Sequence, residues 1–401
     1  MQLEAESSGL AESSTARYRC RMTDSSNTYD VIVAGMGAMG SLTTYELARR
    51  GHRVLGIDRF APPHAMGSSH GHSRIIREAY FEDPRYVPLV QQAYRLWAEL
   101  ETASGRTLFQ QTGGLMLGPP NGTLVRGARL SAELHRLPHD ILSADAVHQR
   151  FPAFHPSDEM IGVWEPRAGI LSPEVCIGAA LSVAASHGAA LHPSETVLGF
   201  DEIPGGVEVT TTHGRYRAKS LVLSVGAWTR ELLADLQLPL VVQRNVMFWF
   251  EPLRRPEQFT AEAFPIFISE YGPNQSWYGF PDVGDGLKVA FHHYGAAVDP
   301  NTIDRTVGPH EVNVVRDVMA RYMPDANGPV TASAACMYTN TPDEHFLIGR
   351  HPAHARVIVA SPCSGHGFKF ASAIGAVLAN LATEKEPGFD ISSFALERFS
   401  A

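Results

Sequence analysis

The fold is decided by a stretch near the start of the chain, Tyr29-Asp30-Val31-Ile32-Val33-Ala34-Gly35-Met36-Gly37-Ala38-Met39-Gly40. Its first half is a β-branched run, typical of a strand that is buried on both faces. The three glycines after it have the spacing of a dinucleotide-binding turn. In such a turn the first glycine permits a tight bend, and the second lets a pyrophosphate approach the backbone. The third lets the helix and the strand pack closely.

The residues after the glycines complete a βαβ unit. Residues 41–50 are predicted to form a helix that Gly51 ends, and residues 53–57 a second strand. Asp58 closes that strand and follows Gly40 by 18 residues, close to the spacing of an acid that accepts a hydrogen bond from ribose. The helix N-terminus, with its free N–H groups, would face the phosphates. The unit predicts a dinucleotide site, and the glycines alone do not choose between NAD and FAD.

The rest of the chain predicts a discontinuous nucleotide-binding domain. Residues 241–295 are dense in aromatics with period-2 alternation, which indicates an antiparallel sheet. The other predicted elements are helices over 85–104 and 174–190, strands within 196–225, a strand over 357–360, a glycine-rich loop over 361–367 and a helix over about 369–383. We therefore expect an α/β fold with a Rossmann-like domain and an α+β second domain. The expected segments are a disordered tail (1–28), the nucleotide domain (29–108, 168–240 and 343–401) and a substrate domain (109–167 and 241–342).

Composition excludes several classes of protein. A chain of 401 residues suits about two domains, and its net charge of −9 argues against binding to nucleic acid or to an acidic membrane surface. No run approaches the ~20 apolar residues that span a membrane, and the first 28 residues lack the apolar core of a signal peptide. The four cysteines are scattered, without metal-ligand spacing or a disulfide framework. We expect a cytoplasmic protein without a metal.

Several motifs lie in one order along almost the whole chain from Tyr29. They are Pro62-Pro63-His64, Gly67-Ser68-Ser69-His70-Gly71-His72-Ser73-Arg74-Ile75-Ile76-Arg77, Tyr278-Gly279-Phe280-Pro281 with Gly286-Leu287-Lys288, Cys336-Met337-Tyr338-Thr339 with Asp343-Glu344-His345-Phe346, and Ser364-Gly365-His366-Gly367-Phe368-Lys369. In these residues the chain resembles the monomeric sarcosine oxidase and N-methyltryptophan oxidase family of FAD-dependent amine oxidases, which also includes pipecolate oxidases. The resemblance implies a Rossmann-like FAD domain and a substrate domain whose antiparallel sheet covers the flavin.

The resemblance also implies a set of cofactor-binding residues. They are Gly35, Gly37, Ala38, Met39, Gly40, Asp58, Arg59, Ser68, Arg74, Gly226, Trp228, Cys336, Gly365, His366, Gly367, Phe368 and Lys369. Cys336 matches the cysteine that carries FAD through an 8α-S-cysteinyl thioether. That reaction needs an accessible thiolate, and so a pKa below the usual value near 8.5. A buried inert thiol is the commoner role of a lone cysteine, and Cys363 is the competing candidate for the linkage.

The residues implied for substrate and catalysis are mostly cationic or aromatic. Arg77 and Lys369 match the two cations that hold the substrate carboxylate, Arg as a bidentate fork and Lys as a point charge, and Tyr338 is a further substrate-binding residue. Lys288 matches a lysine that helps oxygen accept electrons by stabilising a developing anion. Arg74, His70, Tyr278 and His292 complete the implied catalytic set, although the neighbouring His293 makes His292 a less secure match. The role of His72 stays open.

The function so implied is oxidation of a secondary amino acid by FAD. The C–N bond is oxidised to an imine, water hydrolyses the imine, and dioxygen reoxidises the flavin and becomes hydrogen peroxide. Two alternatives remain: a dehydrogenase that passes electrons to another acceptor, and a flavin-binding protein without turnover. The family suggests a monomer. Which N-methylated or cyclic amino acid is the substrate cannot be read from the sequence.

Overall fold

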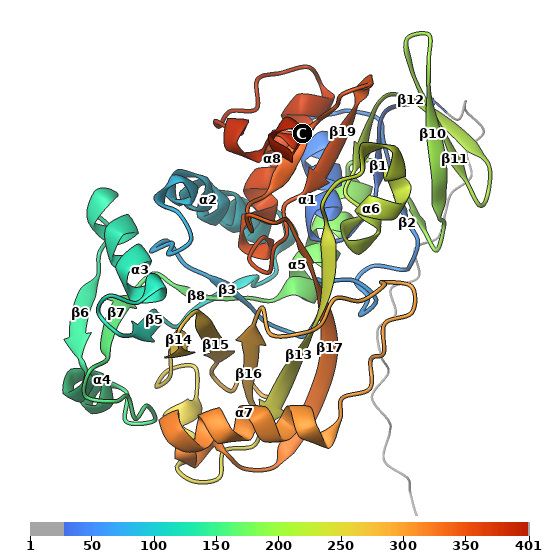
Figure 1. Cartoon of the computed structure of the whole chain (residues 1–401). Helices are drawn as coiled ribbons and strands as arrows, with labels where there is room; N and C mark the ends of the chain where they lie inside the picture. The colour runs from blue at the N-terminus through green and yellow to red at the C-terminus, as the bar shows by residue number, and fades with distance from the viewer. Residues whose placement is uncertain (1–27, 400–401) are drawn as a thin grey trace, which may run out of the picture.

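The computed structural model describes residues 28–399, which form three β-sheets and the helices that cover them (Figure 1). The expected disordered tail lies outside the described residues, except for Thr28 at the start of the first strand. The first sheet has eight strands, which are β1 (Thr28–Ala34), β2 (Val54–Asp58), β9 (Ala190–Pro193), β10 (Val197–Ile203), β11 (Gly206–Thr211), β12 (Arg215–Leu223), β18 (Leu347–His351) and β19 (His354–Ser361).

The centre of the first sheet is parallel. β1 lies between β12 and β2, β9 pairs with β2, and β19 pairs with the last residues of β12. Side chains of β1 alternate between two hydrophobic cores, with Val31 and Val33 in one and Ile32 and Ala34 in the other. The predicted burial of this strand on both faces is confirmed. The arrangement also brings the turn after β1 beside the ends of β2, β12 and β19.

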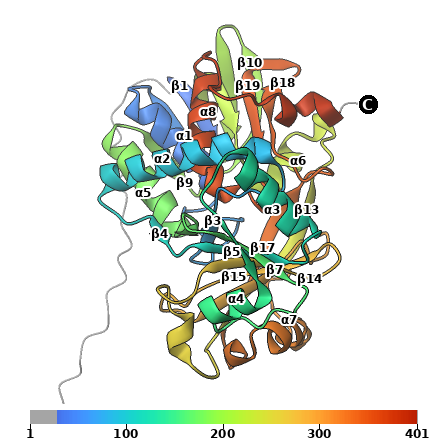
Figure 2. The ribbon, with the colours of Figure 1, turned by 90° about the vertical axis from the view of Figure 1, so that its left-hand side faces the viewer.

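Four helices pack together on one face of this sheet (Figure 2). They are α1 (Ala38–Arg49), α2 (Val87–Ser104), α5 (Pro173–Ser186) and α8 (Ala371–Ala382). The small residues of α8 allow a close approach to α1, because a Cβ at Gly375 would lie 2.7 Å from the backbone of Leu42. The C-terminal segment thereby packs directly on the first βαβ unit.

Two predicted helix boundaries are wrong, and each has a local cause. α1 begins at Ala38 rather than at residue 41, because Gly37 is its N-cap and Gly40 already lies in its first turn. The helix predicted over 174–190 ends at Ser186. Gly188 adopts φ +89°, a left-handed conformation that suits glycine and ends the helix, so the chain can enter β9.

The second large sheet also has eight strands, and all its neighbours are antiparallel except β14 and β5. The strands are β5 (Gly114–Gly118), β6 (Asp140–Ser143), β7 (Ile161–Glu165), β13 (Val241–Phe250), β14 (Ile266–Gly272), β15 (Gln275–Phe280), β16 (Leu287–His292) and β17 (Val330–Asn340). The antiparallel sheet predicted over 241–295 is present, and the one parallel pair arises where the segment near residue 115 joins it.

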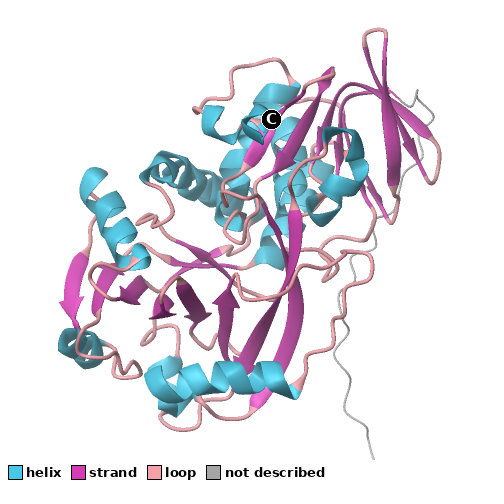
Figure 3. Ribbon diagram, in the orientation of Figure 1, coloured by secondary structure: helices cyan, strands magenta, loops and turns pink. Residues whose placement is uncertain are grey.

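The two faces of this sheet have different partners. Helix α7 (Pro309–Tyr322) covers the face turned away from the first sheet (Figure 3). Phe248 and Phe250 of β13 pack there in the same core as residues of α7. Met247 and Trp249 alternate to the other face and pack near Cys336. The period-2 pattern therefore separates a packing face from a face that is turned toward the first sheet.

The remaining elements connect the two large sheets or cap them. A small sheet of β3 (Arg74–Ile76), β4 (Phe109–Gln111) and β8 (Gly169–Leu171) lies between them, and the other helices are α3 (Thr123–Leu134), α4 (Ala144–Arg150) and α6 (Thr229–Leu232). We propose the division into a nucleotide domain (29–108, 168–240 and 343–401) and a substrate domain (109–167 and 241–342), because neither large sheet draws a strand from the other set. Within residues 28–399, no helix is long and apolar enough to cross a membrane.

Candidate active site

A cavity of about 620 Å³ lies between the two large sheets, within the usual size range of ligand sites. Most of the predicted site residues line it, namely Gly35, Gly37, Ala38, Met39, Asp58, Arg59, Ser68, Arg74, Arg77, Gly226, Trp228, Tyr278, His292, Cys336, Tyr338, Gly365, His366, Gly367, Phe368 and Lys369. Gly40, His70 and Lys288 do not line it. The structure thus brings residues from distant segments of the chain to one cavity.

The three fingerprint glycines occupy three different environments. Gly35 has φ +86°, and a Cβ there would lie 2.4 Å from the carbonyl oxygen of Ser224. A Cβ at Gly37 would meet nothing within 4 Å, whereas one at Gly40 would lie 1.6 Å from the carbonyl oxygen of Gly35. The first and third glycines are therefore required by packing, and the second leaves space beside the N-terminus of α1. This arrangement fits the pyrophosphate of a dinucleotide.

Asp58 is fixed at the edge of the same cavity. Its Oδ2 accepts a hydrogen bond from the backbone N–H of Met36 at 2.6 Å, and its Oδ1 accepts one from Phe60 at 2.8 Å. A carboxylate has about four acceptor sites, so lone pairs remain for a ribose hydroxyl. The backbone contacts hold the Asp58 carboxylate in one orientation at the cavity edge, where it could accept from a ribose hydroxyl.

The side chains of Arg59 and Trp228 both bind Asn301, a residue that the sequence did not indicate. The Oδ1 atom of Asn301 accepts from Arg59 Nη1 at 3.0 Å and from Trp228 Nε1 at 2.9 Å. The Arg59 guanidinium also lies over the Trp228 ring, 5.5 Å from its centroid. No periodicity or motif around Asn301 signals this contact, because it joins segments more than 70 residues apart.

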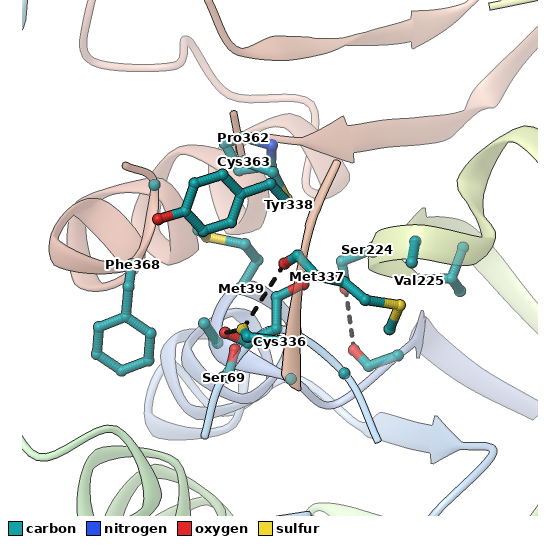
Figure 4. A pocket seen from close by; sticks show the side chains of 18 of the residues that line it. Met39, Ser69, Ser224, Val225, Cys336, Met337, Tyr338, Pro362, Cys363 and Phe368 are labelled. Carbon is teal, nitrogen blue, oxygen red and sulfur yellow. Dashed lines mark hydrogen bonds between the residues drawn. The ribbon is translucent and has the colours of Figure 1, made fainter. Parts of the chain in front are cut away.

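The two cysteines of the cavity differ in their surroundings (Figure 4). Cys336, on β17, places its Sγ 3.9 Å from Arg74 Nη2 and 3.7 Å from the carbonyl oxygen of Ser68. Cys363 lies in the loop after β19, and burial raises the pKa of its thiol to about 11. Both sulfurs thus belong to residues that line the cavity, and only Cys336 has a guanidinium beside it.

Arg77 is buried and already has a carboxylate partner. Its Nη2 donates to both oxygens of Glu82, at 2.9 and 2.7 Å, and its Nη1 donates to the carbonyl oxygen of Ala79 at 2.9 Å. The guanidinium also lies 4.4 Å from the centroid of the Tyr80 ring. Sequence reasoning missed Glu82, although it stands only five residues after Arg77. The Arg77 guanidinium thus binds the carboxylate of Glu82.

Lys369 lies in the same part of the cavity. Its Nζ donates to the carbonyl oxygen of His366 at 2.6 Å and lies 5.1 Å from the centroid of the Tyr80 ring. Burial and then the charge of Arg77 lower the pKa of Lys369 to about 7, while the charge of Glu82 opposes the shift. Such a lysine gains from an anionic ligand, because the anion restores a stable ammonium.

The aromatic wall of the cavity carries three polar groups. The hydroxyl groups of Tyr278 and Tyr338 lie 3.3 Å apart. Burial lowers the pKa of His292 well below its usual value, with smaller contributions from His293 and His366. His292 is therefore neutral at neutral pH, and the unprotonated nitrogen of its ring can accept a hydrogen bond.

Lys288 lies behind the cavity wall. Its Nζ donates to the carbonyl oxygen of Gly71 at 2.6 Å, and to the carbonyl oxygen and the Oγ of Ser73 at 3.0 Å each. Burial lowers its pKa well below the usual lysine value, and Arg74 adds to this. Burial, followed by the charge of Arg74, also lowers the pKa of His70 to about 3, so that His70 is neutral. Lys288 and Arg74 thus lie close enough for the charge of Arg74 to affect the pKa of Lys288.

Other lining residues were missed because they carry no recognisable motif. They include Glu195, Thr196, Val197, Leu198, Ser224, Val225, Asn245 and Met247. Val225 stands directly before the predicted Gly226, and that adjacency is the one signal that could have found it. Pro62, Gly67, Ser69 and Met337 also line the cavity, and they lie within the motifs that carry the family resemblance.

Comparison with known proteins defines the class of this protein. The chain belongs to the family described as FAD dependent oxidoreductase, which matches residues 30–381. The match decides the cofactor that the glycine turn left open, and the fit of the turn, Asp58 and the cavity agrees with FAD. The predicted fold and the FAD assignment are confirmed.

The relatives within this family are named oxidases. The monomeric sarcosine oxidase of Streptomyces avermitilis is 44% identical over 380 residues, covering 94% of this chain and 99% of the relative. The monomeric sarcosine oxidase of Bacillus sp. strain B-0618 is 40% identical over 92% of this chain and 96% of its own. The N-methyl-L-tryptophan oxidase of Yersinia pestis is 36% identical over 92% of this chain and 99% of its own. The resemblance seen in the motifs is confirmed.

Solved structures share the fold. NikD, an amino acid oxidase essential for nikkomycin biosynthesis, has a TM-score of 0.81 at 24% identity, covering 92% of this chain and 97% of its own. The L-proline dehydrogenase from P. horikoshii also has a TM-score of 0.81 at 24% identity, covering 93% and 98%. At this identity the likeness concerns architecture alone.

Proposed function

We propose that this protein is an oxidase of secondary amino acids similar to sarcosine, with FAD as its cofactor and dioxygen as its electron acceptor. The observation that carries the proposal is the pair of buried cations, Arg77 and Lys369, in the wall of a cavity that fits FAD. The names of the relatives, sarcosine oxidase and N-methyl-L-tryptophan oxidase, agree with a small carboxylate-bearing amine as substrate.

The cations explain how a carboxylate is recognised. Arg77 binds Glu82, so a substrate carboxylate must replace that partner or share the guanidinium with it. Lys369 adds a second positive charge that no side-chain carboxylate neutralises directly in the described contacts. The substrate carboxylate would therefore gain two charge-assisted contacts in a buried site.

The same cations assist loss of the amine proton. The amine of a secondary amino acid has a pKa near that of lysine, about 3 pH units above neutral pH. Its deprotonation at neutral pH therefore costs roughly 4 kcal/mol. Positive charges at Arg77, Lys369 and Arg74 lower the amine pKa by repulsion while the first two bind the carboxylate. The neutral ring of His292 and the hydroxyl of Tyr278 can accept hydrogen bonds in the cavity wall, and the amine loses its proton to solvent before oxidation. No acidic base is required.

The oxidation itself needs the cofactor. When bound, FAD accepts the hydride equivalent that the substrate carbon gives up. The chain's own residues hold the neutral amine and the carboxylate in place, and the aromatic wall of Tyr278, Phe280 and Tyr338 limits access of water. Lys288 and Arg74 provide the positive charge that favours electron transfer to dioxygen. The imine product is hydrolysed by water.

We further propose that the flavin is attached to Cys336. If so, acid precipitation of the wild-type protein leaves yellow colour in the pellet, whereas a Cys336→Ser variant releases its FAD into the supernatant. A Cys363→Ser variant is the matched control and should retain its flavin, because burial keeps that thiol protonated. Free FAD from the wild-type protein, or retention by Cys336→Ser, contradicts the assignment.

The alternative functions are not favoured. The relatives that share 36–44% identity are all named oxidases, whereas the proline dehydrogenase shares only the fold. A flavin-binding protein without turnover would not need two buried cations beside the cavity. Release of hydrogen peroxide under air, measured with several secondary amino acids, tests the proposed oxidase directly.

Three further assignments belong to the proposal. The name of the relatives agrees with a monomer. The three cysteines within residues 28–399 form no disulfide, which agrees with the reducing cytoplasm expected from the sequence. Sarcosine itself, a larger N-methylated amino acid and a cyclic amino acid all present the carboxylate and the amine that the cavity would bind.

A further inference from the structure

The segment that carries Arg77 is a loop held from several sides. This loop, residues 77–82 and hereafter the clamp loop, begins with Arg77 and ends with its partner Glu82. Ser131 of α3 donates a hydrogen bond to the carbonyl oxygen of Tyr80. Gly127, also on α3, is packed so tightly that a Cβ there would lie 2.2 Å from the carbonyl oxygen of Phe81. The loop is thus fastened to the substrate domain rather than only to its own strand.

The strongest of these fastenings is a buried carboxylate. Glu165, the last residue of β7, is 1% exposed. Its Oε1 accepts from the backbone N–H of Glu78 at 2.6 Å, and its Oε2 accepts from the N–H of Ala79 at 2.8 Å. Two consecutive N–H groups on one carboxylate form a charge-assisted pair of bonds, which are stronger and more directional than bonds to a neutral acceptor.

A chain of contacts joins this carboxylate to the substrate clamp. The N–H of Ala79 is bound by Glu165, and the carbonyl oxygen of Ala79 is bound by Arg77 Nη1 at 2.9 Å. Rotation of the peptide groups around Ala79 would therefore break both contacts together. Glu165 does not line the cavity, so its effect on a ligand must pass through the clamp loop.

The burial of the Glu165 carboxylate requires a physical explanation. An ionised carboxylate that is removed from water is costly unless its oxygens are well bonded. Burial raises the pKa of Glu165 to about 7, although the two N–H groups and the charge of Arg77 favour its ionised form. A neutral side chain of the same shape would fill the space without this cost. The carboxylate is therefore suited to holding backbone N–H groups, not to filling a core.

We propose that Glu165 is a positioning residue that fixes the Arg77 guanidinium for the carboxylate of the substrate. This positioning role rests on the proposed function, because it takes Arg77 as the carboxylate-binding residue. Glu165 itself contacts neither substrate nor cofactor in this proposal. Its role is to keep the clamp loop in one conformation, so that substrate binding carries little entropic cost for ordering the loop.

The chain offers a matched control in the neighbouring residue. Glu78 is also 1% exposed, and its Oε2 lies 3.5 Å from Arg167 Nε. Its side chain accepts no backbone N–H of the clamp loop in the described contacts, while its own N–H binds Glu165. A Glu78→Gln substitution thus removes the same charge from the same region and leaves both anchoring bonds intact.

The test compares Glu165→Gln with Glu78→Gln as holoenzymes at about pH 8, where Glu165 is mostly ionised. Gln keeps one acceptor oxygen but places an NH₂ group opposite the second backbone N–H. We expect Glu165→Gln to weaken binding of acetate, read from the flavin absorbance, by about tenfold. Binding of neutral acetamide should stay within about twofold, as should kcat with sarcosine, while KM rises in parallel with the acetate constant.

The outcomes separate the possibilities. Unchanged acetate binding in Glu165→Gln overturns the proposal, and so does an equal loss in Glu78→Gln or an equal loss for acetamide. If Glu165→Gln does not fold, Glu165→Asp replaces it. The aspartate is one methylene shorter and reaches one N–H at best, so acetate binding must again weaken selectively for the proposal to stand.

A parallel Arg77→Gln variant separates this proposal from the proposed function. If Arg77→Gln leaves acetate binding unchanged, the carboxylate clamp itself is refuted. If Arg77→Gln weakens acetate and Glu165→Gln does not, only the positioning role fails. In the double variant, Glu165→Gln should add less than about twofold to the loss caused by Arg77→Gln, because both act through the same contact.

Discussion

Replacing Lys369 by Met is expected to raise the KM for a secondary amino acid by about 10- to 100-fold, the value of one charge-assisted contact in a buried site. The ammonium is buried, and its only described hydrogen bond is to the carbonyl oxygen of His366. Methionine has a similar length and keeps the packing, so the loss falls on carboxylate binding. Steady-state kinetics across a range of substrate concentrations measure it.

Two controls separate binding from folding. Lys219 is exposed and pairs with Asp30 far from the cavity, so Lys219→Met should leave KM unchanged. Because burial lowers the pKa of Lys369 from its usual value to about 7, the charged lysine destabilises the fold fully below about pH 7, and this cost fades as the pH rises toward the usual lysine pKa. Lys369→Met should therefore keep or raise the melting temperature at neutral pH. An unchanged KM removes Lys369 from the substrate site.

Replacing Lys288 by Met is expected to slow reoxidation of the reduced enzyme by dioxygen by about 100-fold or more. The first electron that dioxygen accepts makes an anion, and the Lys288 ammonium, whose Nζ has three hydrogen-bond acceptors, would stabilise that anion together with Arg74. Reduction by the substrate under anaerobic conditions should change by less than about fivefold, because Lys288 does not line the cavity. Stopped-flow absorbance of the flavin measures both half-reactions.

The pH dependence has a definite sign. Burial and Arg74 lower the pKa of Lys288, so the ammonium loses its proton at a lower pH than an ordinary lysine. The wild-type reoxidation rate should fall as the pH rises through that pKa, and the Lys288→Met rate should not. If Lys288→Met slowed both half-reactions equally, the role of Lys288 would be structural. Fast reoxidation of the Lys288→Met variant would contradict the role of Lys288 in oxygen reduction.

The sequence predicted the nucleotide-binding half because its signals are local. Two of the three fingerprint glycines, Gly35 and Gly40, have a steric cause within their own turn or against the adjacent strand. The alternation of Val31 to Ala34 likewise reports the two faces of one strand. Such features need only a short window of sequence, and they were found with the correct order of elements.

The rest of the site depends on pairings that no local pattern encodes. Glu165 meets the clamp loop across 87 residues, and Lys288 meets Ser73 across 215. Parallel pairing of β14 with β5 is of the same kind. Sequence reasoning found Lys288 and Arg77 only through resemblance to a family. It missed Glu82, which pairs with Arg77, and Glu165, which binds the backbone of the clamp loop, because single polar residues at such positions carry no periodicity.

The central claim, oxidation of a secondary amino acid at FAD, is tested most directly by mixing the purified enzyme anaerobically with sarcosine, a larger N-methylated amino acid and pipecolate. At least one should bleach the flavin absorbance, and a secondary amine without a carboxylate, such as dimethylamine, should not. Admission of air should then restore the absorbance and release hydrogen peroxide. Absence of bleaching by every secondary amino acid, or bleaching that only an acceptor other than oxygen reverses, would contradict the account.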